Sequence, residues 1–181
     1  MATATHLLTA EEFEQHPSSR WAELVDGVVI ELMPPGGLHG IVAARISTEL
    51  CNFVRPRHLG VVLVEGGFTI RRGPDTVRGP DVSFVRAERV PPTGVPRGFW
   101  AIAPDLVVEI ISPSNTRPEV QTKIREHLEA GVPLVWSVDP DARTVEVVRS
   151  LHDRMLLSAD DIIDGGDVIV GFSCKLSDLF E

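Results

Sequence analysis

The sequence is poor in several residue types, and each scarcity narrows what the protein can be. It has 181 residues but no tyrosine and only two cysteines, and two of its 17 basic residues are lysines. Cys51 and Cys174 have no CxxC spacing, so we expect two buried, reduced thiols and a cytoplasmic protein. No apolar run approaches the roughly 18 residues that a membrane span needs. The segment 1–17 lacks the basic head of a signal peptide, so we expect neither secretion nor a membrane partner.

Basic residues are outnumbered overall, but not in the middle of the chain. The formal net charge is −9, which argues against a protein that coats nucleic acid non-specifically. Residues 1–36 contribute −5 and residues 137–181 contribute −6, whereas residues 37–136 hold twelve bases and ten acids and contribute +2. The middle of the chain is therefore the part suited to contact phosphate.

Hydrophobic residues make up 43% of the chain, which is enough for one domain with a sizeable core. Helical spacing and capping residues predict helices, and runs of β-branched residues predict strands. The expected helices run from Thr9 to near Pro17, over 38–54, and over 120–131 with Gly131 as the stop. The expected strands flank an Asp26-Gly27 hairpin turn and cover 61–65, 68–72, 82–85, 106–111, 134–139 and 144–150. No linker divides the chain, so we expect a single α/β domain with a mixed sheet over residues 1–181.

Two of these strands carry an acid that an apolar strand should not tolerate. Asp81 follows Pro80 at the mouth of the run VSFV, and Glu109 lies inside the run LVVEII. A buried carboxylate without a partner loses its charge or destabilises the fold, so each acid needs a metal ion or another cation. Two carboxylates on neighbouring strands suit a hard cation such as Mg²⁺. We therefore expect the two side chains to converge in a cleft.

Five short motifs occur in an order that is specific, although each motif alone is weak. They are ELVDG at 23–27, a proline pair at 34–35 followed by His39, GPDVSFV at 79–85, PDLVVEIISPS at 104–114, and a lysine followed by GVPLVWSVDP at 131–140. In this order they resemble the Uma2 family of predicted endonucleases, which belongs to the PD-(D/E)XK restriction-endonuclease-like superfamily. The resemblance covers about Thr9 to Phe180. It implies a restriction-endonuclease-like fold, a mixed β-sheet flanked by helices, in one PD-(D/E)XK nuclease-like domain.

The resemblance also implies a metal site. Asp81 and Glu109 take the places of the superfamily's acids, which bind Mg²⁺ or Mn²⁺. Lys123, on the following helix, takes the place of the lysine that positions or activates the attacking water, whereas the usual superfamily position holds Ile111. The residues give independent support, because a chain with fifteen arginines has one of its two lysines here. An ammonium group and a guanidinium group are not chemically equivalent.

Glu23 and His39 are the next candidates. The ELVDG motif implies that Glu23 lies near the metal as a third ligand, and the alternative is an exposed strand carboxylate. His39 starts the first long helix and is either a base or a partner of metal-bound water, or else a residue that faces solvent. Clustered carboxylates repel one another, so without metal at least one of Glu23, Asp81 and Glu109 should have a raised pKa.

Several other polar residues have plainer interpretations. Asp26 suits the hairpin turn, and Asp105 suits the entry of a strand, with metal ligation as the alternative. Ser112 and Ser114 are expected to bond the backbone of a turn, with a phosphate contact as the alternative.

The helix that carries Lys123 holds three more polar residues of interest. Glu126 and Glu129 are expected to lie in solvent. His127 stands where the family usually has a tyrosine, one helical turn after the lysine. This exchange leaves the two acids and the lysine in place.

Together these expectations predict a metal-dependent endonuclease that hydrolyses DNA phosphodiester bonds through an Asp-Glu-Lys site. Arg71, Arg72 and Arg78 are expected to contact DNA phosphates. A nuclease that cuts both strands generally needs two sites, so we also expect a homodimer. Two alternatives remain. One is a nuclease fold that has lost catalysis and serves as a binding or assembly module, and the other is a core in which the acids pair with arginines and no site exists.

Overall fold

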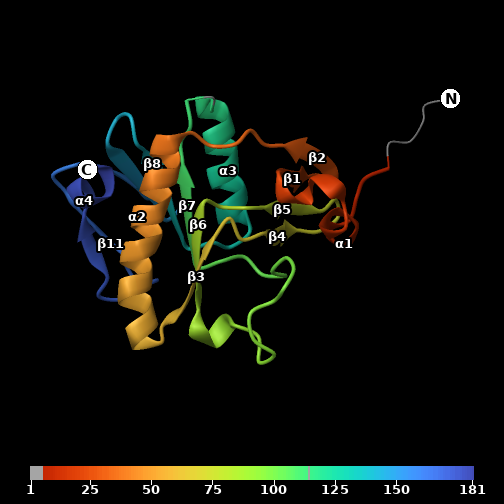
Figure 1. Cartoon of the computed structure of the whole chain (residues 1–181), viewed down its shortest axis with the longest axis horizontal. Helices are drawn as coiled ribbons and strands as arrows, with labels where there is room; N and C mark the ends of the chain where they lie inside the picture. The colour runs from red at the N-terminus through yellow and green to blue at the C-terminus, as the bar shows by residue number, and fades with distance from the viewer. Residues whose placement is uncertain (1–5, 114) are drawn as a thin grey trace.

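The computed structural model describes residues 6–113 and 115–181. A six-stranded mixed sheet lies at the centre of the domain, with helices on both of its faces (Figure 1). The strand order is β10-β9-β8-β7-β6-β3, in which β7 and β8 are parallel and all other neighbours are antiparallel. The strands are β3 (Gly60–Val64), β6 (Val82–Arg86), β7 (Leu106–Ile110), β8 (Leu134–Asp139), β9 (Thr144–Val148) and β10 (Arg154–Ser158).

Alternation along β7 assigns its side chains to the two faces of this sheet. Leu106, Val108 and Ile110 join the core that packs under helix α2 (Gly37–Val54). Val107 joins a second core, which packs under helix α3 (Arg117–Glu129). Glu109 has the same parity as Val107, and the alternation therefore directs its carboxylate toward α3.

The helix ends follow local chemistry. Thr9 forms a capping box with Glu12 at the start of α1 (Ala10–Glu14), as the sequence predicts. Thr116 forms another with Glu119, and α3 therefore begins three residues before the expected position 120. At the other end of α3, Gly131 adopts a φ of +88°, which agrees with its expected role as the stop.

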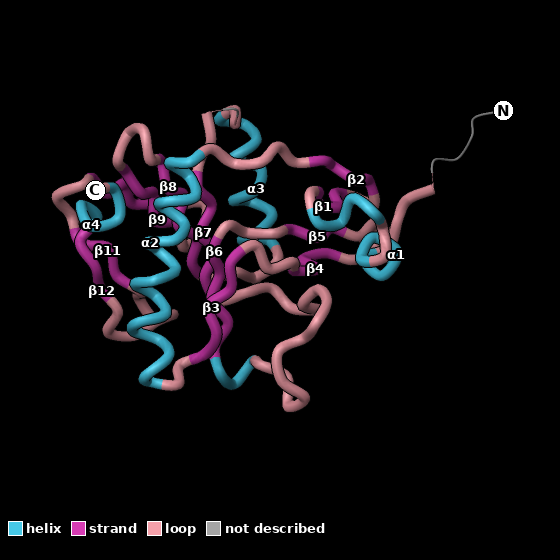
Figure 2. The backbone as a smooth tube through the Cα atoms, in the orientation of Figure 1, coloured by secondary structure: helices cyan, strands magenta, loops and turns pink. Residues whose placement is uncertain are grey.

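A second, four-stranded sheet with the order β2-β1-β5-β4 lies beside the first (Figure 2). Its strands are β1 (Ala22–Val25), β2 (Val28–Glu31), β4 (Phe68–Arg71) and β5 (Thr76–Arg78). Asp26 and Gly27 both have positive φ angles, 51° and 76°, and this confirms the hairpin turn between β1 and β2. The expected strands do not include β5, which lies between the expected strand over 68–72 and Asp81.

The C-terminal segment covers α2 with a small two-stranded sheet, β11 (Ile162–Asp164) and β12 (Ser173–Lys175), and with helix α4 (Leu176–Phe180). Short 3₁₀ helices lie at η1 (Pro17–Arg20), η2 (Arg55–Arg57) and η3 (Ala87–Arg89). Among the described residues, no helix has the length and hydrophobicity to cross a membrane. The expectation of two buried thiols is wrong, because Cys51 is exposed at the end of α2 and Cys174 is half-buried.

Candidate functional site

Asp81 is held where the neighbouring strands β6 and β7 of the six-stranded sheet meet. Antiparallel pairing sets Val82 opposite Val108, so the residue before Val82 lies beside the end of β7. The Oδ2 atom of Asp81 accepts a hydrogen bond from the backbone N–H of Ile110 at 2.6 Å. Its Oδ1 atom lies 3.2 Å from Nε2 of His39, in the first turn of α2. The two contacts fix the carboxylate between a strand end and a helix start.

The environment of Asp81 opposes its ionisation. Burial raises the pKa of Asp81, and the nearby negative charge of Glu109 raises it further, against the hydrogen bonds from His39 and Ile110. The hydrogen bond to Asp81 in turn raises the pKa of His39. The expectation that at least one clustered carboxylate has a raised pKa is thus confirmed at Asp81, with burial as the main cause.

Glu109 has the opposite electrostatic character. Its Oε1 atom lies 2.9 Å from Nε2 of His127, and its Oε2 atom lies 3.4 Å from Nζ of Lys123. The two partners are four residues apart on α3 and therefore share one helix face. Burial by itself would raise the pKa of Glu109, but the Lys123 charge and the His127 hydrogen bond lower it to about 2. The charge of Glu109 likewise raises the pKa of Lys123, which stays protonated.

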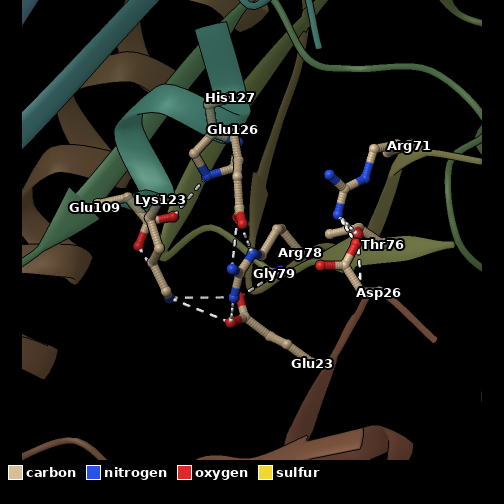
Figure 3. A network of polar contacts seen from close by, with 10 residues as sticks. All are labelled: Glu23, Asp26, Arg71, Thr76, Arg78, Gly79, Glu109, Lys123, Glu126 and His127. Atoms are coloured by element: carbon tan, nitrogen blue, oxygen red, sulfur yellow. Dashed lines mark hydrogen bonds and ion pairs between the residues drawn. The ribbon is translucent and has the colours of Figure 1, made fainter. Parts of the chain in front are cut away.

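Glu23 joins the same network from the second sheet. Its Oε2 atom lies 2.6 Å from Nη1 of Arg78, and its Oε1 atom accepts from the backbone N–H of Gly79 at 3.1 Å. Lys123 lies 3.4 Å from the Glu23 carboxylate, and Arg78 also contacts Glu126 through Nε at 2.8 Å (Figure 3). Lys123 therefore lies between two carboxylates, one from each sheet.

This network overturns two expectations, for Glu126 and Arg78, and one alternative, for Glu23. Glu23 is 2% exposed, so the alternative of an exposed strand carboxylate is wrong. Glu126 is not a solvated residue, because it pairs with Arg78. Arg78 is buried between two carboxylates and is not free to contact DNA phosphate. The positive charge of Arg78 compensates these two carboxylates, which would otherwise be buried without a cation.

One cavity of about 700 Å³ is lined by all five candidate residues. They are Glu23, His39, Asp81, Glu109 and Lys123. The convergence of the two acids on neighbouring strands agrees with the sequence-based expectation. His39 faces Asp81 and is largely buried, so the alternative of a solvent-facing histidine is wrong.

The donor set fits a divalent cation held by two carboxylates. Among residues 6–113 and 115–181, no three side chains of His, Cys, Asp or Glu gather closely enough to hold one metal ion. The expected set of three carboxylates is thus not assembled, because Arg78 and Gly79 hold Glu23. Mg²⁺ is commonly bound through one or two carboxylates, with waters and substrate phosphates completing the shell. Asp81 and Glu109 fit this description, since each carboxylate oxygen accepts one contact and retains another lone pair.

The remaining candidates lie outside the network. Asp26 occupies the hairpin turn and pairs with Arg71. Asp105 accepts from the backbone N–H of Arg86 and pairs with Arg89, so metal ligation by Asp105 is wrong. The backbone N–H of Ser112 bonds to Asn115 in a turn, while the expectation for Ser114 concerns a residue outside the described part of the chain. Glu129 is exposed, as expected.

Arg72 also has acidic partners, Glu11 and Asp75. Neither Arg71 nor Arg72 lines the cavity. The residues that sequence reasoning missed are Arg78 and Glu126 as network members and His127 as the partner of Glu109. The signal for His127 was its spacing of four residues from Lys123 on a helix.

Comparisons with known proteins identify the family of the chain and a similar solved structure. A family model described as "Uma2: Putative restriction endonuclease" matches residues 10–177. The fold is similar to the crystal structure of a "putative nuclease belonging to DUF820" from Anabaena variabilis, with 25% sequence identity and a TM-score of 0.83 over 96% of this chain and 97% of that chain. The comparison with curated proteins gave no match. Both descriptions support a nuclease function in general terms. The family model covers most of the sequence, and the chain therefore belongs to the Uma2 family.

Proposed function

We propose that this protein is a metal-dependent endonuclease that hydrolyses DNA phosphodiester bonds. The observation that carries the proposal is the convergence of Asp81, Glu109 and Lys123 on one cavity, with the lysine held between Glu109 and Glu23. The family and the structural neighbour support the same reaction class. The free cysteines suit a reducing compartment, and we place the reaction in the cytoplasm.

Asp81 and Glu109 would hold Mg²⁺ or Mn²⁺. Such an ion, when bound, lowers the pKa of water and offsets negative charge on the phosphate. Asp81 is kept in place by His39 and Ile110, so it needs no rearrangement to present its free lone pairs. His127 and Lys123 do the same for Glu109, which remains ionised at any physiological pH.

Lys123 supplies a fixed positive charge beside the two acids. Its ammonium group is held 3.4 Å from both Glu23 and Glu109, which raises its pKa and keeps it protonated. A protonated ammonium cannot accept a proton, so Lys123 acts by orienting the attacking water or by stabilising negative charge on the phosphate. Glu23 and Arg78 position this lysine from the second sheet.

One alternative is a core in which every acid is neutralised by a base. Glu23 and Glu126 fit this description, because both pair with Arg78. Asp81 does not fit it, since within the described ranges it pairs with no arginine or lysine and has a raised pKa. A carboxylate held in this state is a feature of a functional site rather than of a charge-paired core.

The other alternative is a binding or assembly module without catalysis, and a plasmid-nicking assay separates it from a nuclease. We expect wild type to nick plasmid DNA with Mn²⁺ and to be inactive with EDTA. Lys123→Ala should lose at least about 100-fold in rate, in line with the loss of one electrostatic group in comparable sites. Lys123→Arg should be similarly poor, because a planar guanidinium does not reproduce a compact charge.

Lys175→Ala is the matched control, since Lys175 is exposed on β12 and does not line the cavity. It should cleave like wild type. Wild-type activity in Lys123→Arg would remove Lys123 from the mechanism, and a wild type without metal-dependent nicking would favour the binding module. Cutting both strands needs two sites, so a homodimer should give linear plasmid early in the reaction, whereas a monomer should give nicked circles first.

A further inference from the structure

The cavity that holds the acids has a second, apolar wall. It is formed by Trp21 after η1, by Ile30 of β2, and by Leu32 and Met33, which follow β2. Trp21 is 68% exposed and Met33 is 84% exposed. Large apolar side chains gathered around a cavity mark a binding site more often than a chance surface. The wall is thus built from the edge strand β2 and the segments that flank the β1-β2 hairpin, whereas Asp81 and Glu109 reach the same cavity from the central sheet.

Positive charge is scarce around this cavity. The cations that line it are Arg20, Arg78 and Lys123. Arg78 and Lys123 already contact carboxylates, whereas Arg20 is exposed at the rim and forms no ion pair with the described residues. Glu31 and Glu65 also line the cavity and add negative charge. A protein that binds duplex DNA gains most of its affinity from many lysine and arginine contacts to phosphates, and this cavity does not supply them.

The available groups match a different form of DNA. Arg20 and Trp21 are consecutive in the chain and both line the cavity, so a cation and an indole border the same cavity. An unpaired nucleotide presents one phosphate to the cation and one base face to the indole, and stacking on aromatic side chains is a main source of affinity for single strands. In a duplex the base faces are covered, and the apolar wall would have no partner.

Resting on the proposed function, we propose that the substrate is DNA with an unpaired strand at the site of cleavage, which a supercoiled plasmid provides where its duplex opens locally. A base of that strand stacks on Trp21 against Leu32 and Met33, and Arg20 contacts the adjoining phosphate. The cavity volume of about 700 Å³ is within the range of cavities that enclose a ligand of small-molecule size. The acids lie in the same cavity, so the strand is cut next to the stacked base.

Intrinsic fluorescence offers a direct test, because the protein has three tryptophans and two of them, Trp100 and Trp136, are buried. A probe of about 12 thymidines, with phosphorothioate linkages that resist hydrolysis, is titrated in Mg²⁺. We expect saturable quenching by the single strand and much weaker binding of the same sequence as a duplex. By anisotropy of a labelled strand, Trp21→Ala should lose roughly 5- to 100-fold in affinity, while Trp21→Phe should stay within about threefold because it retains an aromatic face.

Leu156→Ala is the matched control, since Leu156 is equally exposed but lies on β10, away from the cavity. It should bind like wild type. Duplex bound as tightly as the single strand, or a Trp21→Ala variant with wild-type affinity for the strand, would overturn the inference even if plasmid cleavage still depends on Lys123. Strand binding with Trp21-dependent quenching but without cleavage would support the binding of a single strand at Trp21, but it would overturn the nuclease and with it the assignment of that strand as a substrate.

Discussion

Two carboxylates in one cavity have opposite titration behaviour because their nearest neighbours differ. Glu109 has an ammonium group and an imidazole within 3.4 Å, and these two groups together with the nearby charge of Arg78 outweigh the cost of burial. Asp81 has an imidazole and a backbone N–H, which do not outweigh it. Glu109 is therefore ionised at neutral pH. Ionised Asp81, in contrast, would be stabilised by a cation that no lysine or arginine among the described residues supplies by direct pairing. Such a pair is suited to a site that takes up a metal ion.

His127 offers a prediction at the level of one side chain. It is fully buried, and its Nε2 atom donates to an ionised Glu109. His127→Leu leaves a buried carboxylate without one donor, and we expect a loss of about 1–3 kcal/mol in the free energy of unfolding together with slower cleavage. His127→Gln retains an N–H donor and should recover part of both.

Urea unfolding and the nicking assay measure the two effects of these His127 variants. The cleavage rate distinguishes two roles of His127. If the side chain only fills space, both variants should be less stable than wild type, and His127→Gln should recover no activity relative to His127→Leu. Equal activity in His127→Leu and wild type would show that Glu109 needs no second donor.

The candidate acids could be predicted from the sequence, whereas their partners could not. Asp81 stands at the start of one apolar run and Glu109 interrupts another, and both features are visible in the sequence without structural information. Arg78 and Glu126 are 48 positions apart, and nothing local marks them as a pair. Arg78 pairs with Glu23 and Glu126 because folding brings the three residues together. This pairing is not visible in the sequence, and the expectation that Arg78 contacts DNA is therefore wrong.

Three elements meet at Arg78, and this contact joins the two sheets. Arg78 ends β5, Glu23 lies on β1, and Glu126 lies on α3 above the central sheet. The same junction places Lys123 beside Glu23. The orientation of Lys123 therefore depends on how the smaller sheet packs against α3.

Arg78→Met tests this junction. Removing one partner of a buried ion pair leaves the other charge uncompensated, which costs about 3–5 kcal/mol, and here two carboxylates lose their partner. We expect a loss of at least that size in the free energy of unfolding by urea. Adding Glu23→Gln and Glu126→Gln should restore part of it, because the uncompensated charges are then gone.

Arg154→Met is the comparison variant, since Arg154 pairs with Glu146 at a partly exposed position. Its cost should be about 1 kcal/mol or less. Equal costs for the two arginines would mean that the junction contributes no more than a surface pair.

Element prediction succeeded where the local signal was strong and failed where pairing decided the structure. The Asp26-Gly27 hairpin and the cap at Thr9 were predictable, because a turn and a capping box are specified by a few adjacent residues. β5 has three residues within a stretch rich in glycine, proline and charge. It becomes a strand because β1 and β4 pair with it on either side, and no window of the sequence contains that information.

At the level of the whole molecule, Asp81 and Glu109 should have opposite effects on how the free energy of unfolding depends on pH. The pKa of Glu109 falls from 4.5 to about 2 on folding. Its stabilising contribution to the free energy of unfolding is therefore complete above pH 4.5 and is lost as the pH falls toward 2. The pKa of Asp81 rises above 3.8, so its contribution is complete below that value and is lost as the pH rises through the higher pKa. At neutral pH without metal, Glu109 therefore stabilises the fold and Asp81 weakens it.

A divalent cation should reverse the effect of Asp81, because it binds the folded pair of carboxylates and not the unfolded chain. At about 100 times the dissociation constant the gain is about 2.7 kcal/mol, or roughly 5–10 °C in Tm for a domain of this size. The gain should be present at pH 7.5 and should disappear at pH 3, which lies below the raised pKa of Asp81, because the protonated carboxyl cannot act as a ligand. The variant Asp81→Asn tests whether Asp81 is a ligand of this cation. In EDTA at pH 7.5 it should melt no lower than wild type, since it removes a charge that burial opposes, and Mn²⁺ should leave its Tm unchanged. Thermal melts of the two proteins with Mn²⁺ and with EDTA at both pH values measure all of these effects. A wild-type Tm that does not respond to saturating Mn²⁺, or an equal response in Asp81→Asn, would show that the pair is not a metal site.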